Sequence, residues 1–104
     1  FGIVGLETAV GVTYPLLTGP GRMSLREWAA RWTIGPARLL GFPVPGLNPG
    51  QPADVAILDL ASEWTVNPDD FLSRSRNSPF IGRTLRGKVV CTIAAGAIAY
   101  REPR

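Results

Sequence analysis

The sequence predicts an α+β fold, with helices in its first forty residues and strands in the rest. Apolar residues recur at helical spacing from Gly5 to Gly41, with capping residues beside them. Residues 42–54 are rich in proline and glycine and cannot be helical. After this connection, short runs of β-branched and aromatic residues are typical of strands. We therefore place a boundary between two parts of the chain within residues 42–54.

The first expected helix covers residues 5–17, GLETAVGVTYPLL, and ends at the turn-rich residues 18–23. Gly11 and Pro15 weaken its helical pattern. The side chains expected on its inner face are those of Leu6, Ala9, Val10 and Thr13.

A second helix is expected directly after this turn. Ser24 is its expected N-cap, and Glu27, three residues later, has the spacing of a capping box. Its apolar positions, at i, i+3, i+4 and i+7, are Leu25, Trp28, Ala29 and Trp32.

A third helix is expected to follow in series. Thr33 is its expected cap, Pro36 is tolerated in its first turn, and Gly41 ends it. Its inner side is expected to hold Ala37 and Leu40.

The second part of the chain is expected to be mainly strands. DVAILDL at residues 54–60 and EWTV at 63–66 predict two strands, and residues 67–73 predict a short helix capped by its asparagine. Residues 83–100 predict a hairpin with its turn at residues 95–96. Neither hairpin strand alternates cleanly between polar and apolar residues. This pattern indicates burial on both faces or a partner strand from outside the chain.

The charge and hydropathy patterns favour no nucleic-acid or membrane partner. The net charge is +3, from eleven lysines and arginines against eight acids. The densest basic residues lack interleaved aromatic side chains, so we expect a solvated basic face. These residues are Arg74, Arg76, Arg83, Arg86 and Lys88. No apolar run approaches the ~20 residues that a membrane helix needs, and we expect a soluble protein.

The absence of histidine limits the chemistry that these residues can perform. With no histidine and one cysteine, a metal site in these residues would rely mainly on carboxylates and carbonyls, which favour magnesium or calcium over zinc. Histidine-based catalytic triads are excluded. Cys91 lies in the apolar run VVCTIA and is expected to be a buried, unreactive thiol. It has no second cysteine with which to form a disulfide.

Several other side chains have a functional and a structural interpretation, and we favour the structural one. A carboxylate such as Glu7, in the first turn of a helix, more often accepts hydrogen bonds from free backbone N–H groups than acts as an acid catalyst. Asp54 and Asp59 flank a strand, where an aspartate more often fixes a turn than binds a cation. Trp28, Trp32 and Trp64 could form a stacking platform for a ligand. The helical spacing of Trp28 and Trp32, however, favours core positions for these two side chains.

The first residues, FGIVGLETAV, contain neither an initiator methionine nor the basic segment and long apolar core of a signal sequence. We therefore expect the chain to be part of a longer polypeptide.

Three stretches carry a family resemblance: FGIVGLETA, TIGPARLLG and LNPGQPADVAILDLASEWTVNPDDFLSRSRNSPFIGRTLRGKVVCTIAAGAIAY. Together they are similar to the C-terminal portion of a bacterial dihydroorotase of the amidohydrolase superfamily. GxPADxxxxDL occurs in many amidohydrolases, whereas GLETA after FG, EWTV and NSPFIGxxLxGKV are more specific to dihydroorotases. The resemblance covers nearly the whole chain.

The resemblance implies a (β/α)8 barrel, which needs about 250 residues by itself. Residues 1–46 would then be the closing loop and helices of the catalytic barrel. Residues 47–104 would be part of a small β-sandwich, completed by strands from the N-terminus of the same polypeptide. This arrangement would explain the irregular strand pattern.

The resemblance also implies the reaction, which is the reversible hydrolysis of dihydroorotate to N-carbamoyl-L-aspartate in pyrimidine biosynthesis. In such cytoplasmic enzymes a metal, usually zinc, activates the water that attacks the ring carbonyl, and an aspartate transfers the proton. The metal ligands and this aspartate precede Phe1 in the family. No catalytic residue or metal ligand is therefore expected in this chain, and its zinc would be bound by residues outside it.

The resemblance assigns one substrate-binding element to this chain. Phe1 and Gly2 match a Phe-Gly pair whose main chain contacts the pyrimidine, in the loop after the eighth barrel strand. Active sites of barrels lie at the C-terminal ends of the strands, and glycine allows a ligand to approach the backbone. The alternative is that Gly2 only permits a turn.

The partners implied by the resemblance are the remainder of the polypeptide, the substrate dihydroorotate and a second copy in a homodimer. Two alternatives differ in function. One is another cyclic amidohydrolase, an allantoinase or dihydropyrimidinase. The other is a non-catalytic dihydroorotase homologue that serves as a partner of aspartate carbamoyltransferase.

Overall fold

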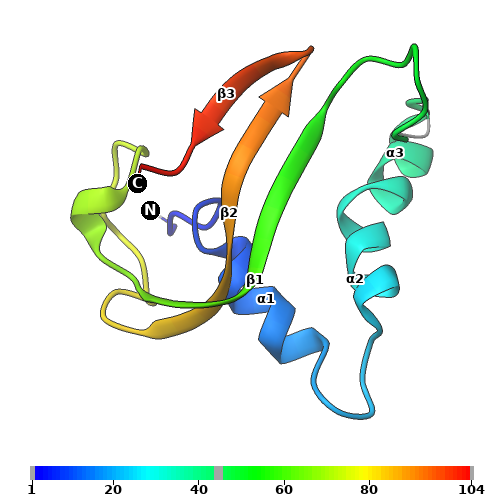
Figure 1. The fold of residues 1–104 in the computed structure, drawn as a ribbon. Helices are drawn as coiled ribbons and strands as arrows, with labels where there is room; N and C mark the ends of the chain where they lie inside the picture. Colours follow the sequence, from blue (N-terminus) through cyan, green and yellow to red (C-terminus); the bar gives the residue numbers. More distant parts are fainter. Residues whose placement is uncertain (1, 44–45, 104) are drawn as a thin grey trace.

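The structure, a computed structural model, describes residues 2–43 and 46–103 and confirms the expected order of helices followed by strands (Figure 1). The elements in chain order are α1 (Ala9–Leu17), α2 (Leu25–Trp32), α3 (Ile34–Leu40), β1 (Val55–Thr65), the 3-10 helix η1 (Pro68–Asp70), β2 (Thr84–Ala94) and β3 (Ala97–Arg101). The fold is a small α+β arrangement with one three-stranded antiparallel sheet in the order β1-β2-β3.

The two strands expected at residues 54–66 are one long strand, β1, which pairs along its length with β2. The register shifts between Asp59 and Glu63. At this bulge the Asp59 carboxylate accepts hydrogen bonds from the N–H groups of Ala61 at 3.1 Å and Ser62 at 3.0 Å. The prediction of two strands was therefore wrong, because a bulge held by Asp59 replaces the expected break. The structural interpretation of Asp59 is confirmed.

The expected hairpin between β2 and β3 is confirmed. Its turn residues, Ala95 and Gly96, have φ values of 50° and 81°, the positive values that a two-residue type I′ turn needs. Asp54 accepts a hydrogen bond from the Ala95 N–H at 2.8 Å, and Gly96 N–H donates to the Ala53 carbonyl at 3.0 Å. Asp54 thus has the expected structural role of fixing a turn, but the turn lies 41 residues away in sequence and not in its own backbone.

Replacing Ala95 with asparagine is expected to stabilise the protein by about 0.5–1 kcal/mol, because asparagine tolerates a left-handed backbone better than alanine does. The midpoint of urea unfolding of Ala95→Asn should rise. Ala94→Asn, one residue earlier in β2, is the matched control and should not raise it. An unchanged midpoint for Ala95→Asn would contradict the assigned turn geometry.

Helix α1 begins at Ala9, four residues later than expected, and Leu6 is 90% exposed. The inner face also differs from the prediction, because Gly11 is the buried residue of the helix. A Cβ at Gly11 would lie 3.0 Å from both the Gly87 carbonyl oxygen and the Leu85 Cβ. The glycine that weakens the helical pattern therefore lets α1 pack directly on β2.

The N-terminus of α2 is formed as predicted, since the Ser24 hydroxyl oxygen accepts a hydrogen bond from the Glu27 N–H at 3.1 Å. Trp28 is 2% exposed and lies edge-on to Tyr14 of α1, with ring centres 5.4 Å apart. Trp32 is 46% exposed, so its predicted place in the core was wrong. Trp28 also donates its indole N–H to the Thr13 hydroxyl of α1, whereas Trp32 lies edge-on to Trp28 with ring centres 6.3 Å apart and stays half-exposed.

Helix α3 ends at Gly41 as predicted, with a left-handed φ of 74°. Thr33 gives no side-chain cap, because its hydroxyl donates to the Ala29 carbonyl at 2.9 Å. Ala37 is buried as expected, but Leu40 is 64% exposed. The predictions for the Thr33 cap and for Leu40 were therefore wrong.

The short helix expected at residues 67–73 is the single 3-10 turn η1, which ends at Asp70. Its predicted cap is confirmed: the Asn67 side chain accepts a hydrogen bond from the Asp69 N–H at 2.9 Å. The N–H groups that follow, at Leu72 and Ser73, are hydrogen-bonded to Glu7 and do not continue the helix.

The described residues enclose only a small core. Its apolar members below 10% exposure are Trp28, Ala37, Val66 and Phe71. The accessible area is 7895 Å², compared with about 5,700 Å² for a compact monomer of this mass. The radius of gyration is 14.9 Å, compared with about 13 Å for a compact domain of this length. The fold is therefore open, with much of its apolar surface uncovered.

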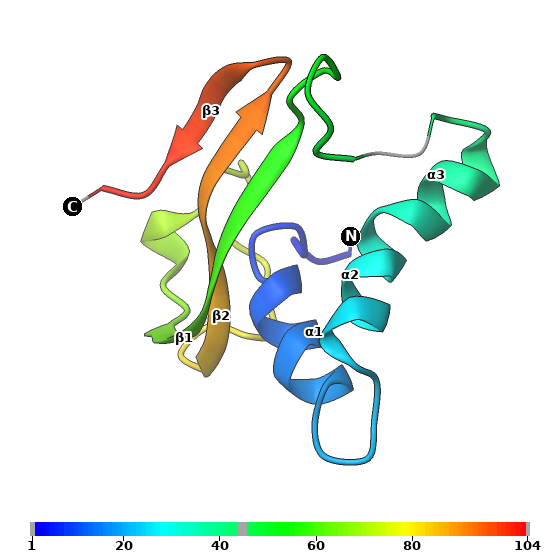
Figure 2. The ribbon, with the colours of Figure 1, turned by 45° about the vertical axis from the view of Figure 1, so that its right-hand side comes forward.

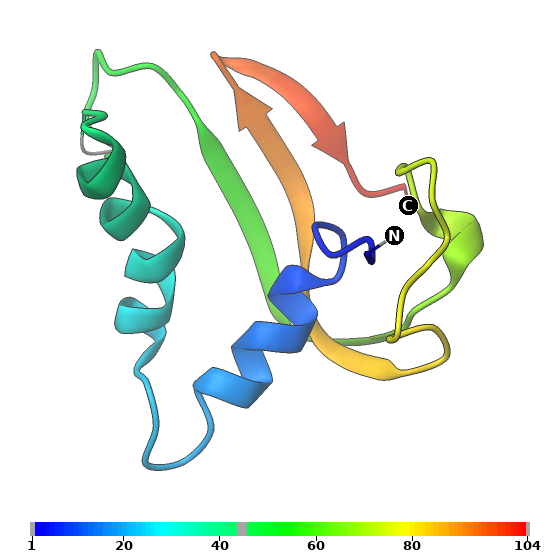
Figure 3. The same cartoon turned by 180° about the vertical axis from the view of Figure 1, so that it is seen from behind.

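The position of the helices explains this open shape. Helices α2 and α3 form a column that stands away from the sheet (Figures 2 and 3). Strand β3 is exposed throughout, and Cys91 in β2 is half-buried. The prediction of a buried Cys91 was wrong, because no described layer covers that part of the sheet.

Candidate functional site

The candidate site is the loop at the start of the chain, which contains the expected substrate-binding pair. Phe1 lies outside the described residues. Gly2 has a φ of 76°, and a Cβ at this position would meet no atom within 4 Å. Glycine is thus favoured here by its backbone conformation and not by crowding. The space beside Gly2 is open to a ligand or to another part of the protein.

A distant segment of the chain holds this loop. The Asn77 side-chain amide donates to the Gly2 carbonyl, and the Val4 N–H donates to the Asn77 carbonyl at 2.9 Å. The Ser75 hydroxyl oxygen accepts from the Asn77 N–H at 3.1 Å. The first two bonds join residues more than 70 positions apart. The sequence indicates no role for Asn77, because no local pattern of residues marks such a long-range pair.

Glu7 makes a second connection between the same two segments. Its carboxylate accepts hydrogen bonds from the N–H groups of Leu72 at 2.8 Å and Ser73 at 2.9 Å, and from the Ser73 hydroxyl. The structural interpretation of Glu7 is confirmed. Its partners, however, lie in the segment after η1, and Glu7 itself precedes α1, which begins at Ala9.

The surroundings of Glu7 keep its carboxylate ionised at neutral pH. Burial by itself would raise the pKa of Glu7. The hydrogen bonds from the Ser73 hydroxyl and the Leu72 and Ser73 N–H groups, together with the charge of Arg76, lower this pKa below its ordinary value. A carboxylate with a lowered pKa holds no proton to donate at neutral pH, which disfavours an acid-catalyst role for Glu7.

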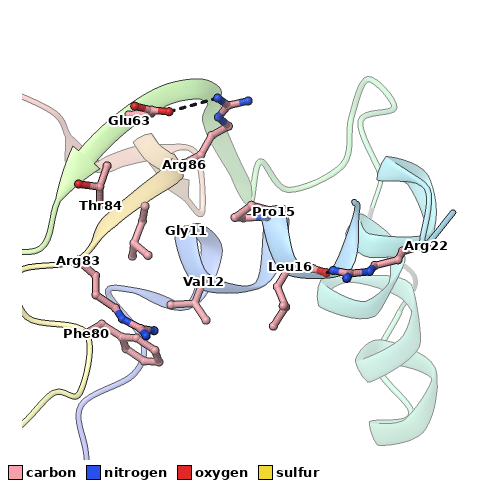
Figure 4. Close-up of a pocket in the computed structure, with 11 residues that line it drawn as sticks. Gly11, Val12, Pro15, Leu16, Arg22, Glu63, Phe80, Arg83, Thr84 and Arg86 are labelled. Atoms are coloured by element: carbon pink, nitrogen blue, oxygen red, sulfur yellow. Dashed lines mark hydrogen bonds and ion pairs between the residues drawn. The ribbon is translucent and has the colours of Figure 1, made fainter. Parts of the chain in front are cut away.

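A hollow of about 440 Å³ lies between α1 and the start of β2 (Figure 4). Three arginine side chains border it. Arg86 pairs with Glu63 at 3.2 Å, and the Arg83 guanidinium carbon lies 5.9 Å from the centre of the Phe80 ring. Arg22 donates to the Leu16 carbonyl. Each guanidinium therefore already has a partner within the described part of the chain.

A larger hollow, of about 730 Å³, opens on the sheet between Leu6, Phe71 and Tyr100. Lys88 and Glu102 form an ion pair on its wall. The hydrogen bond to Glu102 raises the pKa of Lys88, although burial opposes this change. The paired lysine is protonated and is not a base at neutral pH.

The side chains present do not fit a zinc site. Among residues 2–43 and 46–103, no three His, Cys, Asp or Glu side chains are grouped so that they could hold a metal ion. The chain has no histidine, the usual nitrogen ligand of zinc. In addition, Asp54 and Asp59 already accept backbone hydrogen bonds at separate turns.

None of the helices in the described part of the chain combines the length and apolar character needed to cross a membrane.

The sequence from residue 2 to residue 100 matches the profile of the amidohydrolase family. The chain belongs to the amidohydrolase family. Curated relatives within this family include the dihydroorotase of Anaeromyxobacter dehalogenans strain 2CP-1, which is 45% identical over 99% of this chain. The dihydroorotase of Bacillus subtilis strain 168 is 42% identical over the whole of this chain. This amidohydrolase chain covers 24% of the length of each of these two relatives.

A solved amidohydrolase has the same arrangement of elements. It is the L-hydantoinase (dihydropyrimidinase) from Arthrobacter aurescens, with a TM-score of 0.82 and 33% identity. The match covers 99% of this chain and 23% of the hydantoinase. The expected family resemblance is therefore confirmed. The division of the amidohydrolase chain at residues 46 and 47, and the roles of Phe1 and Gly2, stay predictions.

Proposed function

We propose that the chain is part of a dihydroorotase, which hydrolyses dihydroorotate reversibly to N-carbamoyl-L-aspartate. The observation that carries the proposal is the 39–46% identity to dihydroorotases over 96–100% of the chain. The similarity to the hydantoinase is lower, at 33% identity. Another cyclic amidohydrolase is therefore the less favoured function.

The open fold supports a role as one portion of a larger enzyme. The accessible area exceeds that of a compact monomer by roughly 2,000 Å², and the exposed side chains include Leu6, Leu39 and Leu72 at 84% or more. We assign residues 1–46 to the closing loop and helices of a barrel and residues 47–104 to part of a β-sandwich. The remainder of the polypeptide would cover the open faces. A homodimer and a cytoplasmic location belong to the same proposal.

The role assigned to this chain in the reaction is substrate binding by the loop at Phe1 and Gly2. The main chain at Gly2 has no side chain beside it and is open on its Cβ side. Its N–H and carbonyl groups could thus approach the amide groups of a cyclic substrate. Zinc, if it is the metal of the enzyme, would supply the activation of water from ligands outside these residues. The residues of this chain would orient the substrate.

The full-length protein that contains this chain tests the proposal. It should hydrolyse dihydroorotate and, in the reverse direction, cyclise N-carbamoyl-L-aspartate. Dihydrouracil, hydantoin and allantoin should be much poorer substrates. Hydrolysis of one of these three in place of dihydroorotate would replace the proposed function by that of a different cyclic amidohydrolase. A folded protein with no hydrolysis of any of them would favour a non-catalytic homologue.

Replacing Gly2 with alanine tests the proposed site. The left-handed φ of 76° costs an alanine about 1–2 kcal/mol, so the loop should move to a different backbone conformation. We expect the KM for dihydroorotate to rise about tenfold. Gly50→Ala imposes a similar backbone strain, at φ 88°, in the connection before β1, and should leave KM unchanged. If Gly2→Ala lowers stability without affecting KM, Gly2 only permits a turn.

A further inference from the structure

Residues 72–77, here called the strap, are joined at both ends to the loop that begins the chain. At one end, the Glu7 carboxylate accepts from the N–H groups of Leu72 and Ser73. At the other end, Asn77 contacts the Gly2 carbonyl and the Val4 N–H. The strap and residues 2–7 thus lie side by side, although about 65–75 positions separate them in sequence.

Packing holds residues 2–6 only weakly, because Val4 is the one residue among them that is half-buried. Ile3 is 60% exposed and Leu6 is 90% exposed, and a Cβ placed on Gly2 or Gly5 would meet nothing within 4 Å. Hydrogen bonds to the strap therefore determine where the Gly2 carbonyl lies. Among the described residues, Asn77 is the one strap residue whose side chain hydrogen-bonds to Gly2.

The two bonds of Asn77 are of different kinds. Its main-chain carbonyl accepts from Val4, and this contact remains with any side chain at the position. Its side-chain amide donates to Gly2, and this contact needs an N–H donor of the right length. A substitution at Asn77 can therefore remove the Gly2 contact selectively and leave the Val4 contact intact.

We propose that Asn77 is a positioning residue, which holds the Gly2 carbonyl and so places the main chain of the Gly2 loop against the substrate. This role rests on the proposed function, in which the loop contacts dihydroorotate. Asn77 itself does not touch the substrate. It acts on substrate affinity through the loop, and the Glu7 end of the strap keeps the segment in place.

The sharpest test is Asn77→Asp in the full-length protein. The two side chains have the same shape, but a carboxylate oxygen in place of the amide nitrogen would repel the Gly2 carbonyl. We expect the KM for dihydroorotate to rise about tenfold, while kcat per folded protein changes less than twofold. Asn48→Asp introduces the same charge change in the connection before β1, and should leave both constants unchanged.

A purely structural role for Asn77 would give a different result. It would lower the melting temperature and the folded fraction without changing KM, and that outcome would overturn the proposal. Asn77→Ala removes the donor without adding charge and should give a smaller rise in KM if the aspartate variant fails to fold. If both variants fail to fold, Asn77 is a structural residue and the proposal is wrong.

The wild-type control separates this inference from the proposed function. Wild-type protein that does not hydrolyse dihydroorotate contradicts the proposed function, whatever the variants do. If the wild type hydrolyses another cyclic amide, the KM for that substrate tests Asn77 in the same way. An active wild type and an equally active Asn77→Asp variant, with the same KM, would contradict the inference alone.

Discussion

Replacing Gly11 with valine is expected to reduce the free energy of unfolding by about 3 kcal/mol, because the new side chain has no space to occupy. The added Cβ would lie 3.0 Å from the Gly87 carbonyl oxygen and 3.0 Å from the Leu85 Cβ. The carbonyl cannot easily move aside, since it also accepts a hydrogen bond from the Trp64 indole N–H at 2.9 Å. We expect α1 to be displaced from β2, and the midpoint of urea unfolding of the full-length protein to fall.

Gly5→Val is the matched control for this substitution. A Cβ at Gly5 would have no atom within 4 Å of it, and the φ of Gly5 is not positive. The same change should therefore alter stability by less than about 0.5 kcal/mol, as is typical of surface sites. Equal effects of the two variants would mean that the close contact of α1 with β2 does not contribute to stability.

Replacing Glu7 with alanine is expected to lower the free energy of unfolding by about 2 kcal/mol, because hydrogen bonds to a charged acceptor are stronger than those between neutral groups. The variant leaves the Leu72 and Ser73 N–H groups and the Ser73 hydroxyl without their acceptor. Glu7→Gln retains one acceptor oxygen and should cost less. Glu63→Gln, in an ion pair with both side chains more than half exposed, should cost less than about 0.5 kcal/mol. A similar cost for Glu7→Ala and Glu63→Gln would contradict the connection between the strap and the loop.

The lowered pKa of Glu7 also predicts a dependence of stability on pH. The stabilisation that the Glu7 carboxylate contributes to the folded state is complete above the ordinary carboxyl pKa of about 4.3. Below that, it disappears as the pH falls through the lower pKa of the folded state, where the carboxylate becomes protonated. Unfolding midpoints measured from pH 7 to acid should therefore converge for wild type and Glu7→Gln. If the unfolding midpoints of wild type and Glu7→Gln differ by the same amount at every pH, the charge of Glu7 is not the cause of its stabilising effect.

The local features of the fold could largely be predicted from the sequence. The Ser24 cap, the Gly41 end of α3, the Asn67 cap and the Ala95–Gly96 turn depend on neighbouring residues and were found from spacing. Apart from the Thr33 cap, the predictions that failed for side chains concern burial, as for Trp32, Leu40 and Cys91. Burial depends on what lies across from a residue, and periodicity shows only that a side chain is apolar.

The candidate site was predicted in part. The resemblance pointed to Gly2, and its positive φ is consistent with the choice of glycine at that position. Asn77 was missed because its partners Gly2 and Val4 are far away in sequence. Glu7 was correctly given a structural role, but its partners were misplaced, since the rule for the first turn of a helix considers only nearby N–H groups.

The sequence by itself determined the helix and strand order, the main caps and turns, the lack of a histidine ligand and the family. The caps, turns and element order depend on residue types and on spacings of a few positions, whereas the family was recognised from a resemblance over nearly the whole chain. Only the tertiary structure decided that Gly11 is a packing contact, that a bulge at Asp59 joins two expected strands into one, and that Asn77 and Glu7 join the strap to the first loop. Such contacts form between segments that are distant in sequence, and the spacing of neighbouring residues does not predict which distant segments will be in contact.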